Sequence, residues 1–432
     1  MIFLLNFLLI VNFIIAIRSF KDYSSPPILM GAGMMIASII ALFYYDEWRL
    51  DKMLFTTVMI IGGGMFLFTF YCILFKKHFK PISLEGPQLI TFKYFNVKKL
   101  QKFYLFIIIF QIIIVTLKIY FMASFFGSSL SLTGLMNEFR EDTVHSKDFS
   151  MPSLVRMAGT ICMIVSYLTS WLLALQLLSK NRNKFLFKML ICQLVLTMFE
   201  SLLGGAKGIM FDVLIRTAII VLVIYYSRNG SYTISRSVKF KMCCALVFLV
   251  IFFKAVNQLI GRGVDDFDSF YFFAIYCGAE IKIFDKYMQG DIIINNEYFG
   301  GKTFRNLYAS IMPEARIESI PFQYEEGHFL GNVGTQFYYI CSDFGITGVV
   351  VVLFIVGLIS MYFYSLSTRS INEPTTPNAF LLIYASMGLA LFMSFFSSRF
   401  TEDVFRFGYV RQSIYIFIIV WFFRKNFLKK TK

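Results

Sequence analysis

Residues 103–126, FYLFIIIFQIIIVTLKIYFMASFF, decide the fold class of this chain. The single charged side chain in the run is Lys118, and every other position is apolar or uncharged. A helix needs about 17 to 25 mainly apolar residues to cross the hydrocarbon core of a bilayer, and this run meets that length. The segment therefore predicts a membrane-spanning helix.

The composition of the whole chain agrees with this prediction. Of its 432 residues 57% are hydrophobic and only 16% are charged, and the mean hydropathy is +0.67. A soluble domain carries about 25% charged residues. It could not bury this much Phe, Ile and Leu in one core either. We therefore expect an integral membrane protein with lipid around most of its surface.

Further apolar runs of spanning length lie on both sides of the first one. Together they predict an all-α, polytopic membrane protein with about eleven transmembrane helices. The run at the amino terminus lacks the basic flank and small-residue cleavage site of a signal peptide, so it is expected to be a span. The runs lie near residues 2–17, 28–45, 54–75, 103–126, 155–178, 185–203, 209–226, 241–258, 345–364, 379–397 and 409–423.

The distribution of Lys and Arg between the loops predicts the orientation. Cationic residues concentrate in cytosolic loops of membrane proteins. Here they concentrate in segments 76–102 and 179–184 and in the carboxyl-terminal tail, with Arg18 and Lys21 on the same side. The amino terminus is therefore expected outside and the carboxyl terminus in the cytosol. The net charge of +15 then reflects cationic flanks facing anionic lipid, so no nucleic-acid partner is expected.

One long polar stretch stands out from the otherwise short connections. We expect the chain to divide into residues 1–258, with the earlier spans, a large external loop at 259–344, and residues 345–432, with the remaining spans and a cytosolic tail. Within the loop, residues 270–288 predict an amphipathic helix whose polar face holds Glu280, Lys282, Asp285 and Lys286. A second polar segment near 127–153 could fold over the loop.

The far end of the loop has a recognisable pattern. The order is His328-Phe-Leu-Gly-Asn332-Val-Gly-Thr335, then Asp343-Phe-Gly-Ile-Thr-Gly348, which is expected to break a helix at the membrane interface, and then an apolar helix with Gly357. With basic residues beside glycines at 204–208 and 260–263, this layout resembles the Wzy-type O-antigen polymerase family.

The resemblance implies a glycosyltransferase in the bacterial inner membrane that needs no metal or cofactor. It would join oligosaccharide units carried on undecaprenyl pyrophosphate at the periplasmic face. Membrane lipid, a chain-length regulator and a flippase are its expected partners. The amino terminus would then be periplasmic and the product an O-antigen or related surface polysaccharide.

Such a reaction needs cations to bind the pyrophosphate and stabilise it as it leaves. Arg suits this task because its planar guanidinium binds phosphate oxygens in pairs. The stronger candidates are Arg262, Lys207 and Arg399. Each has a structural alternative: Lys207 could snorkel to headgroups, Arg262 could anchor the interface, and Arg399 could pair with Glu402 or Asp403. Further substrate-binding candidates are Arg305, Arg316 and Asn332.

A base could accept the proton of the attacking sugar hydroxyl. His328 is the first candidate because its unperturbed pKa lies near neutrality, although a surface histidine without a role is as common. Glu325 and Glu326 are alternatives, and Arg262 completes the catalytic candidates. Asp343 is expected to be structural, as a helix cap or an ion-pair partner. Asp266 and Asp268 form an Asp-x-Asp pattern, but we expect no metal site there.

Other functions fit the same sequence. A ligase would use similar machinery to transfer the glycan to a lipid A core or a protein, and a flippase or exporter of lipid-linked sugar would bury substrate-binding charges inside its spans. A structural or assembly protein without activity is a further alternative. The charges expected inside spans are few, and this scarcity favours surface chemistry over transport. They are Glu200, Asp212, Arg216 and Lys254.

Overall fold

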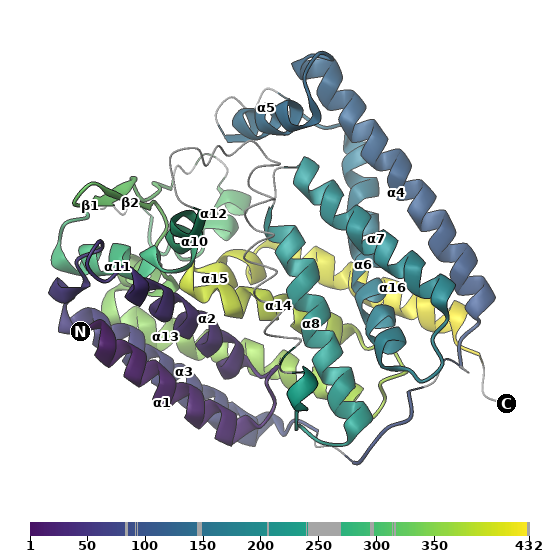
Figure 1. The fold of residues 1–432 in the computed structure, drawn as a ribbon, viewed down its shortest axis with the longest axis horizontal. Coiled ribbons are helices and arrows are strands. Elements are labelled where there is room, and N and C mark those ends of the chain that lie inside the picture. Colours follow the sequence, from purple (N-terminus) through teal and green to yellow (C-terminus); the bar gives the residue numbers. More distant parts are fainter. Residues whose placement is uncertain are drawn as a thin grey trace. The chain divides into compact units, whose positions relative to one another are not determined.

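The computed structural model describes the chain outside a set of short gaps and one longer one. These gaps are residues 83–84, 91, 93, 145–148, 205–206, 239, 241–268, 294–297, 313, 315–316 and 430–432. The described part is almost entirely helical, and its only strands are β1 (Gln323–Glu325) and β2 (His328–Gly331), which pair antiparallel. The expected all-α class is therefore confirmed for these residues (Figure 1).

Eight helices in the described part are long and apolar enough to cross a membrane. They match predicted runs, with ends shifted by a few residues. They are α1 (Ile2–Phe20), α2 (Pro26–Phe43), α3 (Phe55–Phe79), α4 (Val97–Phe126), α6 (Ser153–Leu178), α7 (Lys184–Leu203), α8 (Lys207–Asn229) and α13 (Gln336–Ser367).

Three predicted spans fall outside this set. The span at 241–258 lies outside the described residues. The apolar stretch at 379–397 forms the short helix α14 (Ala379–Phe392) followed by a 3-10 turn, η3 (Met393–Phe395). The run at 409–423 forms α16 (Phe407–Phe427), in which Arg411, Arg424 and Lys425 reduce the apolar character. The described part is that of a membrane protein, and its eight candidate spans leave the expected count of about eleven unconfirmed.

The chain forms two compact units. The first contains Met1–Ile82, Asp268–Ser367 and Ser386–Ser413. In it α1, α2, α3 and α13 pack side by side (Figure 1). The α3–α13 contact depends on Gly64, because a Cβ at this position would lie 2.4 Å from the Phe337 ring.

The two ends of this helix bundle differ in character. At one end Tyr364 donates a hydrogen bond to Asp22 (2.8 Å) and Ser365 to the carbonyl of Phe79 (2.9 Å), so the loops after α1 and α3 meet the end of α13. The loop 44–54 lies at the opposite end, together with the residues before and after β1 and β2. This end holds the short elements α10 (Ser269–Cys277), α11 (Ala279–Gln289), β1, β2, α12 (Arg305–Ile311) and α15 (Arg399–Val404).

The break predicted at 343–348 is present. Helix α13 is interrupted at Gly345, whose φ of 64° and ψ of −164° are not helical. Residues on both sides of the break pack on α3, and Asp343, just before the break, reaches the turn that precedes α12. A φ in this range favours glycine, which explains why the break falls there.

The observed structure of the helix predicted at 270–288 differs from the expectation in two ways. It is divided into α10 and α11 at Gly278, where a Cβ would lie 2.9 Å from the backbone nitrogen of Ala41, so both helices press against α2. An amphipathic helix usually exposes its polar face to water, but here Glu280, Lys282 and Asp285 are at most 1% exposed. Lys282 and Asp285 have partners inside the protein, whereas the carboxyl oxygens of Glu280 have no hydrogen-bond partner among the described residues. A polarity pattern in the sequence cannot distinguish such partners from solvent.

The second unit contains Ser83–Phe267, Thr368–Ala385 and Ile414–Lys432. Its helices α4, α6, α7 and α8 pack on one another, and α5 (Leu132–Val144), from the predicted second loop, packs on α4. The charges expected inside its spans are paired: Lys118 with Glu200 (2.7 Å) and Arg216 with Asp212 (2.9 Å). Lys254 lies outside the described residues.

Candidate anion-binding cavity

A cavity of about 340 Å³ opens among the short elements of the first unit. The turn before α12 and the first residues of α12 form one side, and α15 with the segment before it forms another. The segments on either side of the β-hairpin complete the wall. The lining residues are Lys302, Arg305, Asn306, Ile317, Glu318, Ser319, Ile320, Asn332, Val333, Tyr339, Phe396, Ser397, Arg399 and Glu402.

Two hydrogen bonds tie the sides of the cavity together. The hydroxyl of Thr401, in α15, donates to the backbone carbonyl of Thr303 (2.5 Å). The side-chain amide of Asn306, in α12, donates to the backbone carbonyl of Glu402 (3.0 Å). Segments almost 100 residues apart in the chain are therefore held at fixed positions around the cavity, as a binding site requires.

Lys302 is the most unusual residue of the lining. It follows Gly300 and Gly301, and Gly300 has a φ of 75° that allows the tight turn. Asp343 fixes this turn, because its carboxylate accepts hydrogen bonds from the backbone N–H groups of Thr303 (2.6 Å) and Lys302 (3.4 Å). Asp343 thus holds the turn through backbone N–H groups, which is neither the helix cap nor the ion pair considered from the sequence.

The ammonium group of Lys302 is buried without a partner. The residue is only 6% exposed, and its Nζ has no hydrogen-bond partner within the described part of the chain. Burial lowers the pKa of this lysine, and the charges of Asp343 and Glu318 offset the shift only partly. A buried cation is normally paired, because leaving it unpaired costs free energy. An ammonium group in this situation attracts an anion.

Two arginines add positive charge to the same cavity. Arg305 is the first residue of α12 and is exposed. Arg399 is the first residue of α15, and its guanidinium lies 5.4 Å from the centre of the Phe396 ring. Its Nη1 is also 3.8 Å from Oε2 of Glu402, which is the local ion pair considered as its alternative role. That separation exceeds a hydrogen bond, so Arg399 retains donors for a ligand.

Glu402 is a buried acidic group in this cationic setting. It is 8% exposed, and its Oε1 accepts a hydrogen bond from the Ser397 hydroxyl (2.8 Å). Burial raises the pKa of the Glu402 carboxyl, and the charge of Arg399 and the Ser397 hydrogen bond lower it less than burial raises it. The cavity therefore combines three cationic side chains, Lys302, Arg305 and Arg399, with a carboxyl group whose proton affinity is increased.

The structure brings together only some of the residues selected from the sequence. Arg305, Arg399 and Asn332 all line the cavity. Arg262 and Arg316 lie outside the described residues, as do Asp266 and Asp268, and the side chain of Lys207 is not described either.

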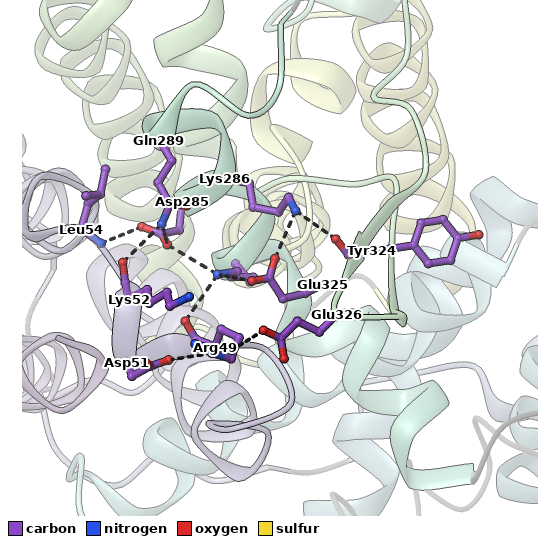
Figure 2. A network of polar contacts seen from close by, with 11 residues as sticks. Arg49, Asp51, Lys52, Leu54, Asp285, Lys286, Gln289, Tyr324, Glu325 and Glu326 are labelled. Carbon is purple, nitrogen blue, oxygen red and sulfur yellow. Dashed lines mark hydrogen bonds and ion pairs between the residues drawn. The ribbon is translucent and has the colours of Figure 1, made fainter.

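The candidate bases lie elsewhere in the same unit. Glu325 and Glu326 belong to an ion-pair network with α11 and the loop 44–54, shown in Figure 2. Glu325 pairs with Lys282 (3.3 Å) and Lys286 (3.1 Å), and Glu326 pairs with Arg49. His328, on β2, is exposed, with its ring 6.3 Å from that of Tyr271. None of the three contributes to the described lining of the cavity.

The same network fixes the hairpin. Asp285 accepts hydrogen bonds from the hydroxyl of Thr57 (2.7 Å) and from the backbone N–H of Leu54 (2.9 Å), which anchors α11 to the start of α3. Figure 2 shows the bond to Leu54. Lys286 donates to the carbonyl of Tyr324 (2.9 Å), which attaches β1 to α11. Lys282 and Lys286, two charges of the predicted polar face, therefore stabilise the position of the hairpin.

Lys302 and Glu402 are the two functional candidates not selected from the sequence. Lys302 follows a pair of glycines, as Lys207 nearly does in Gly204-Gly205-Ala206-Lys207, so the same pattern could have identified it. Glu402 was considered only as a partner of Arg399. Its burial next to a cavity is not visible in the sequence.

Comparison with known proteins adds no relative: no family model, curated protein or solved structure matches this chain.

Proposed function

We propose that the chain is a membrane glycosyltransferase that polymerises oligosaccharide units carried on undecaprenyl pyrophosphate. The cavity binds the pyrophosphate of the lipid-linked donor, and the product is an O-antigen or related surface polysaccharide. In this proposal the chain has about eleven spans in the bacterial inner membrane, with the end of the first unit that contains the cavity facing the periplasm.

The observation that supports the proposal most directly is the unpaired ammonium group of Lys302. Together with Arg305 and Arg399 it supplies three cations to one cavity, against the carboxylates of Glu318 and Glu402. Pyrophosphate carries several negative charges, and both Arg and Lys bind phosphate oxygens through charge-assisted hydrogen bonds. A neutral sugar alone would not compensate the buried charge of Lys302.

The charge of the opposite end of the unit supports the proposed orientation. Arg18, Lys21, Lys76, Lys77 and Lys80 lie there, and Lys76 donates a hydrogen bond to the carbonyl of Ser19 (2.6 Å). Such a basic end is typical of the cytosolic side of a membrane protein. The cavity, at the other end, would then face the compartment in which lipid-linked units are polymerised.

The proposal favours a polymerase over a transporter for a reason that concerns the spans. Of the charges expected inside the spans, Glu200 of α7 pairs with Lys118 of α4. Asp212 and Arg216 pair with each other, one turn apart in α8. A flippase would need charges that exchange a helix partner for the substrate. A ligase shares the proposed chemistry and differs in the acceptor.

Reconstitution of the full chain in liposomes tests the proposal. Wild-type protein given undecaprenyl-pyrophosphate-linked oligosaccharide should produce a ladder of longer products on a gel. Lys302→Gln should reduce product formation strongly, and Lys80→Gln, at the opposite end, should not. Product formation only after addition of a lipid A core acceptor would indicate a ligase instead. Transfer of the intact donor across the bilayer without chain growth would overturn the proposal.

A further inference from the structure

We propose that Glu402 is the base that accepts a proton from the attacking sugar hydroxyl. This inference rests on the proposed function and adds to it the acid–base group of the same cavity. Three geometric facts support it: Glu402 lines the cavity, it lies one helical turn from Arg399, and it is buried.

The two carboxylate oxygens have different surroundings. Oε1 accepts the Ser397 hydrogen bond (2.8 Å), which fixes the orientation of the carboxylate. Oε2 lies 3.8 Å from the nearest Arg399 nitrogen, beyond hydrogen-bond distance. An acceptor hydroxyl that enters the cavity can therefore donate to Oε2 without first displacing a strong hydrogen bond.

The charged and titratable groups around Glu402 adjust its proton affinity. Burial has the largest effect and raises the pKa of the carboxyl, and Asp403 on the same helix acts in the same direction. Arg399 on α15 and Arg305 on α12 lower it, as does the Ser397 hydrogen bond. Tyr339 of α13 lies within electrostatic range as well. A carboxylate whose pKa is raised is a stronger base at neutral pH than an exposed one.

The proposed step balances. The acceptor hydroxyl oxygen attacks the anomeric carbon of the donor sugar, and a new glycosidic C–O bond forms. The bond between that carbon and the pyrophosphate oxygen breaks, and its electron pair stays on undecaprenyl pyrophosphate. The proton of the hydroxyl moves to Oε2 of Glu402. Lys302, Arg305 and Arg399 stabilise the charge that develops on the leaving pyrophosphate.

The position of Glu402 distinguishes it from the bases selected from the sequence. Glu325 is already compensated by two lysines, so its carboxylate is held by charges that a substrate would have to displace. His328 is exposed on the hairpin and does not contribute to the cavity lining. A base must reach the reacting hydroxyl within hydrogen-bond distance, directly or through one water.

The decisive experiment measures the rate of chain growth by reconstituted wild type, Glu402→Gln, Glu402→Asp and Asp403→Asn as a function of pH. Asp403 is the matched control, because it is the next residue of α15, lies near Arg406 (4.0 Å) and is not part of the cavity lining. Affinity for the lipid-linked donor and thermal stability are measured on the same samples.

Glu402→Gln should lower kcat by about 10²- to 10⁴-fold. It should change donor affinity less than threefold and keep the protein folded. Wild-type activity should fall on the acid side, as Glu402 becomes protonated, and this acid limb should be absent in the residual activity of Glu402→Gln. Glu402→Asp should retain more activity than Glu402→Gln. Asp403→Asn should stay within threefold of the wild-type rate at neutral pH and keep an acid limb, displaced to lower pH because Asp403 helps to raise the pKa of Glu402.

Two results would overturn the inference. If Glu402→Gln elongates chains within threefold of the wild-type rate with the same acid limb, Glu402 is not the base although the proposed function stands. If the loss of activity appears entirely in donor affinity or thermal stability, and equally in Glu402→Asp, Glu402 has a structural role only. Absence of chain growth by the wild type itself would instead overturn the proposed function.

Discussion

Replacement of Lys302 by Met separates stability from function in the cavity. Met has a similar length and no charge, so Lys302→Met removes the buried ammonium group with little change in packing. Since Nζ has no partner within the described residues, the substitution breaks no hydrogen bond recorded there. We therefore expect the variant to be more stable than the wild type and to bind anions less tightly.

The magnitude follows from burial. An unsatisfied buried polar group costs about 1–3 kcal/mol, and a charged one costs more. Because Lys302 is 6% exposed, Lys302→Met should raise the free energy of unfolding by about 1–3 kcal/mol at neutral pH. The lowered pKa of Lys302 gives the pH dependence. The penalty is complete below the folded-state pKa and disappears as pH rises toward the ordinary value of 10.5, so the gain should shrink there.

Anion binding should change in the opposite direction. A charge-assisted hydrogen bond contributes about 1.5–3 kcal/mol, so Lys302→Met should weaken pyrophosphate binding roughly 10- to 150-fold. Inorganic pyrophosphate at about 100 times its Kd should stabilise wild-type protein by about 2.7 kcal/mol. At the same concentration the variant should gain far less.

The assay is thermal unfolding of the full chain in lipid nanodiscs, with and without pyrophosphate. Lys282→Met is the matched control. Lys282 is 1% exposed but pairs with Glu325 (3.3 Å), so its loss should destabilise the protein. The expected cost is roughly 1–3 kcal/mol, less than for a fully broken buried pair because Lys286 still compensates Glu325. A loss of stability in Lys302→Met, or an unchanged response to pyrophosphate, would refute the reasoning.

Three other experiments test the packing of α11 and of the spans. Burial raises the pKa of Glu280 well above 4.5, so the folded state retains the proton of this carboxyl and becomes less stable as pH rises. Glu280→Gln should therefore flatten the dependence of unfolding temperature on pH above about 5. An unchanged slope would contradict this. Gly278→Ala should lower stability by about 1–3 kcal/mol, because the new Cβ would lie 2.9 Å from the backbone nitrogen of Ala41. A double-mutant cycle of Lys118→Met and Glu200→Gln should give a coupling of about 0.5–2 kcal/mol in nanodiscs, and additive effects would show that their 2.7 Å ion pair does not stabilise the helix packing.

The spans were predictable because their signal is local. A run such as 103–126 is apolar over its whole length, and a helix is the form in which such a run can satisfy its backbone hydrogen bonds in lipid. The break at Gly345 was also predictable, since a glycine-rich segment interrupted an apolar run too long for one span. In both cases the residues that determine the structure are neighbours in the sequence.

The burial of the short elements was not predictable in the same way. Glu280, Lys282 and Asp285 form a regular polar face, and the same pattern describes a helix that faces water and a helix whose charges have partners. Asp285 finds its partner in the loop 44–54, and Lys282 finds its partner in β1, both far from α11 along the chain. A single sequence contains no information on which distant residues meet, so the burial of this polar face could not be predicted.

The candidate residues of this protein differ less in their charge than in whether that charge already has a partner. Lys282 and Lys302 are both buried, but Lys282 faces Glu325 whereas the Nζ of Lys302 has no hydrogen-bond partner among the described residues. Compensated charges such as those of Lys282 and Glu325 hold the β-hairpin on α11, and both ends of that hairpin continue into the cavity wall, through Ile320 before it and Asn332 after it. The paired charges thus fix the shape of the wall, whereas the ammonium group of Lys302 has no hydrogen-bond partner in the part of the chain that the structure describes, and in the proposed function it binds the pyrophosphate. Residue type and position in a loop could not separate these two roles, because the difference depends on the partner of each charge.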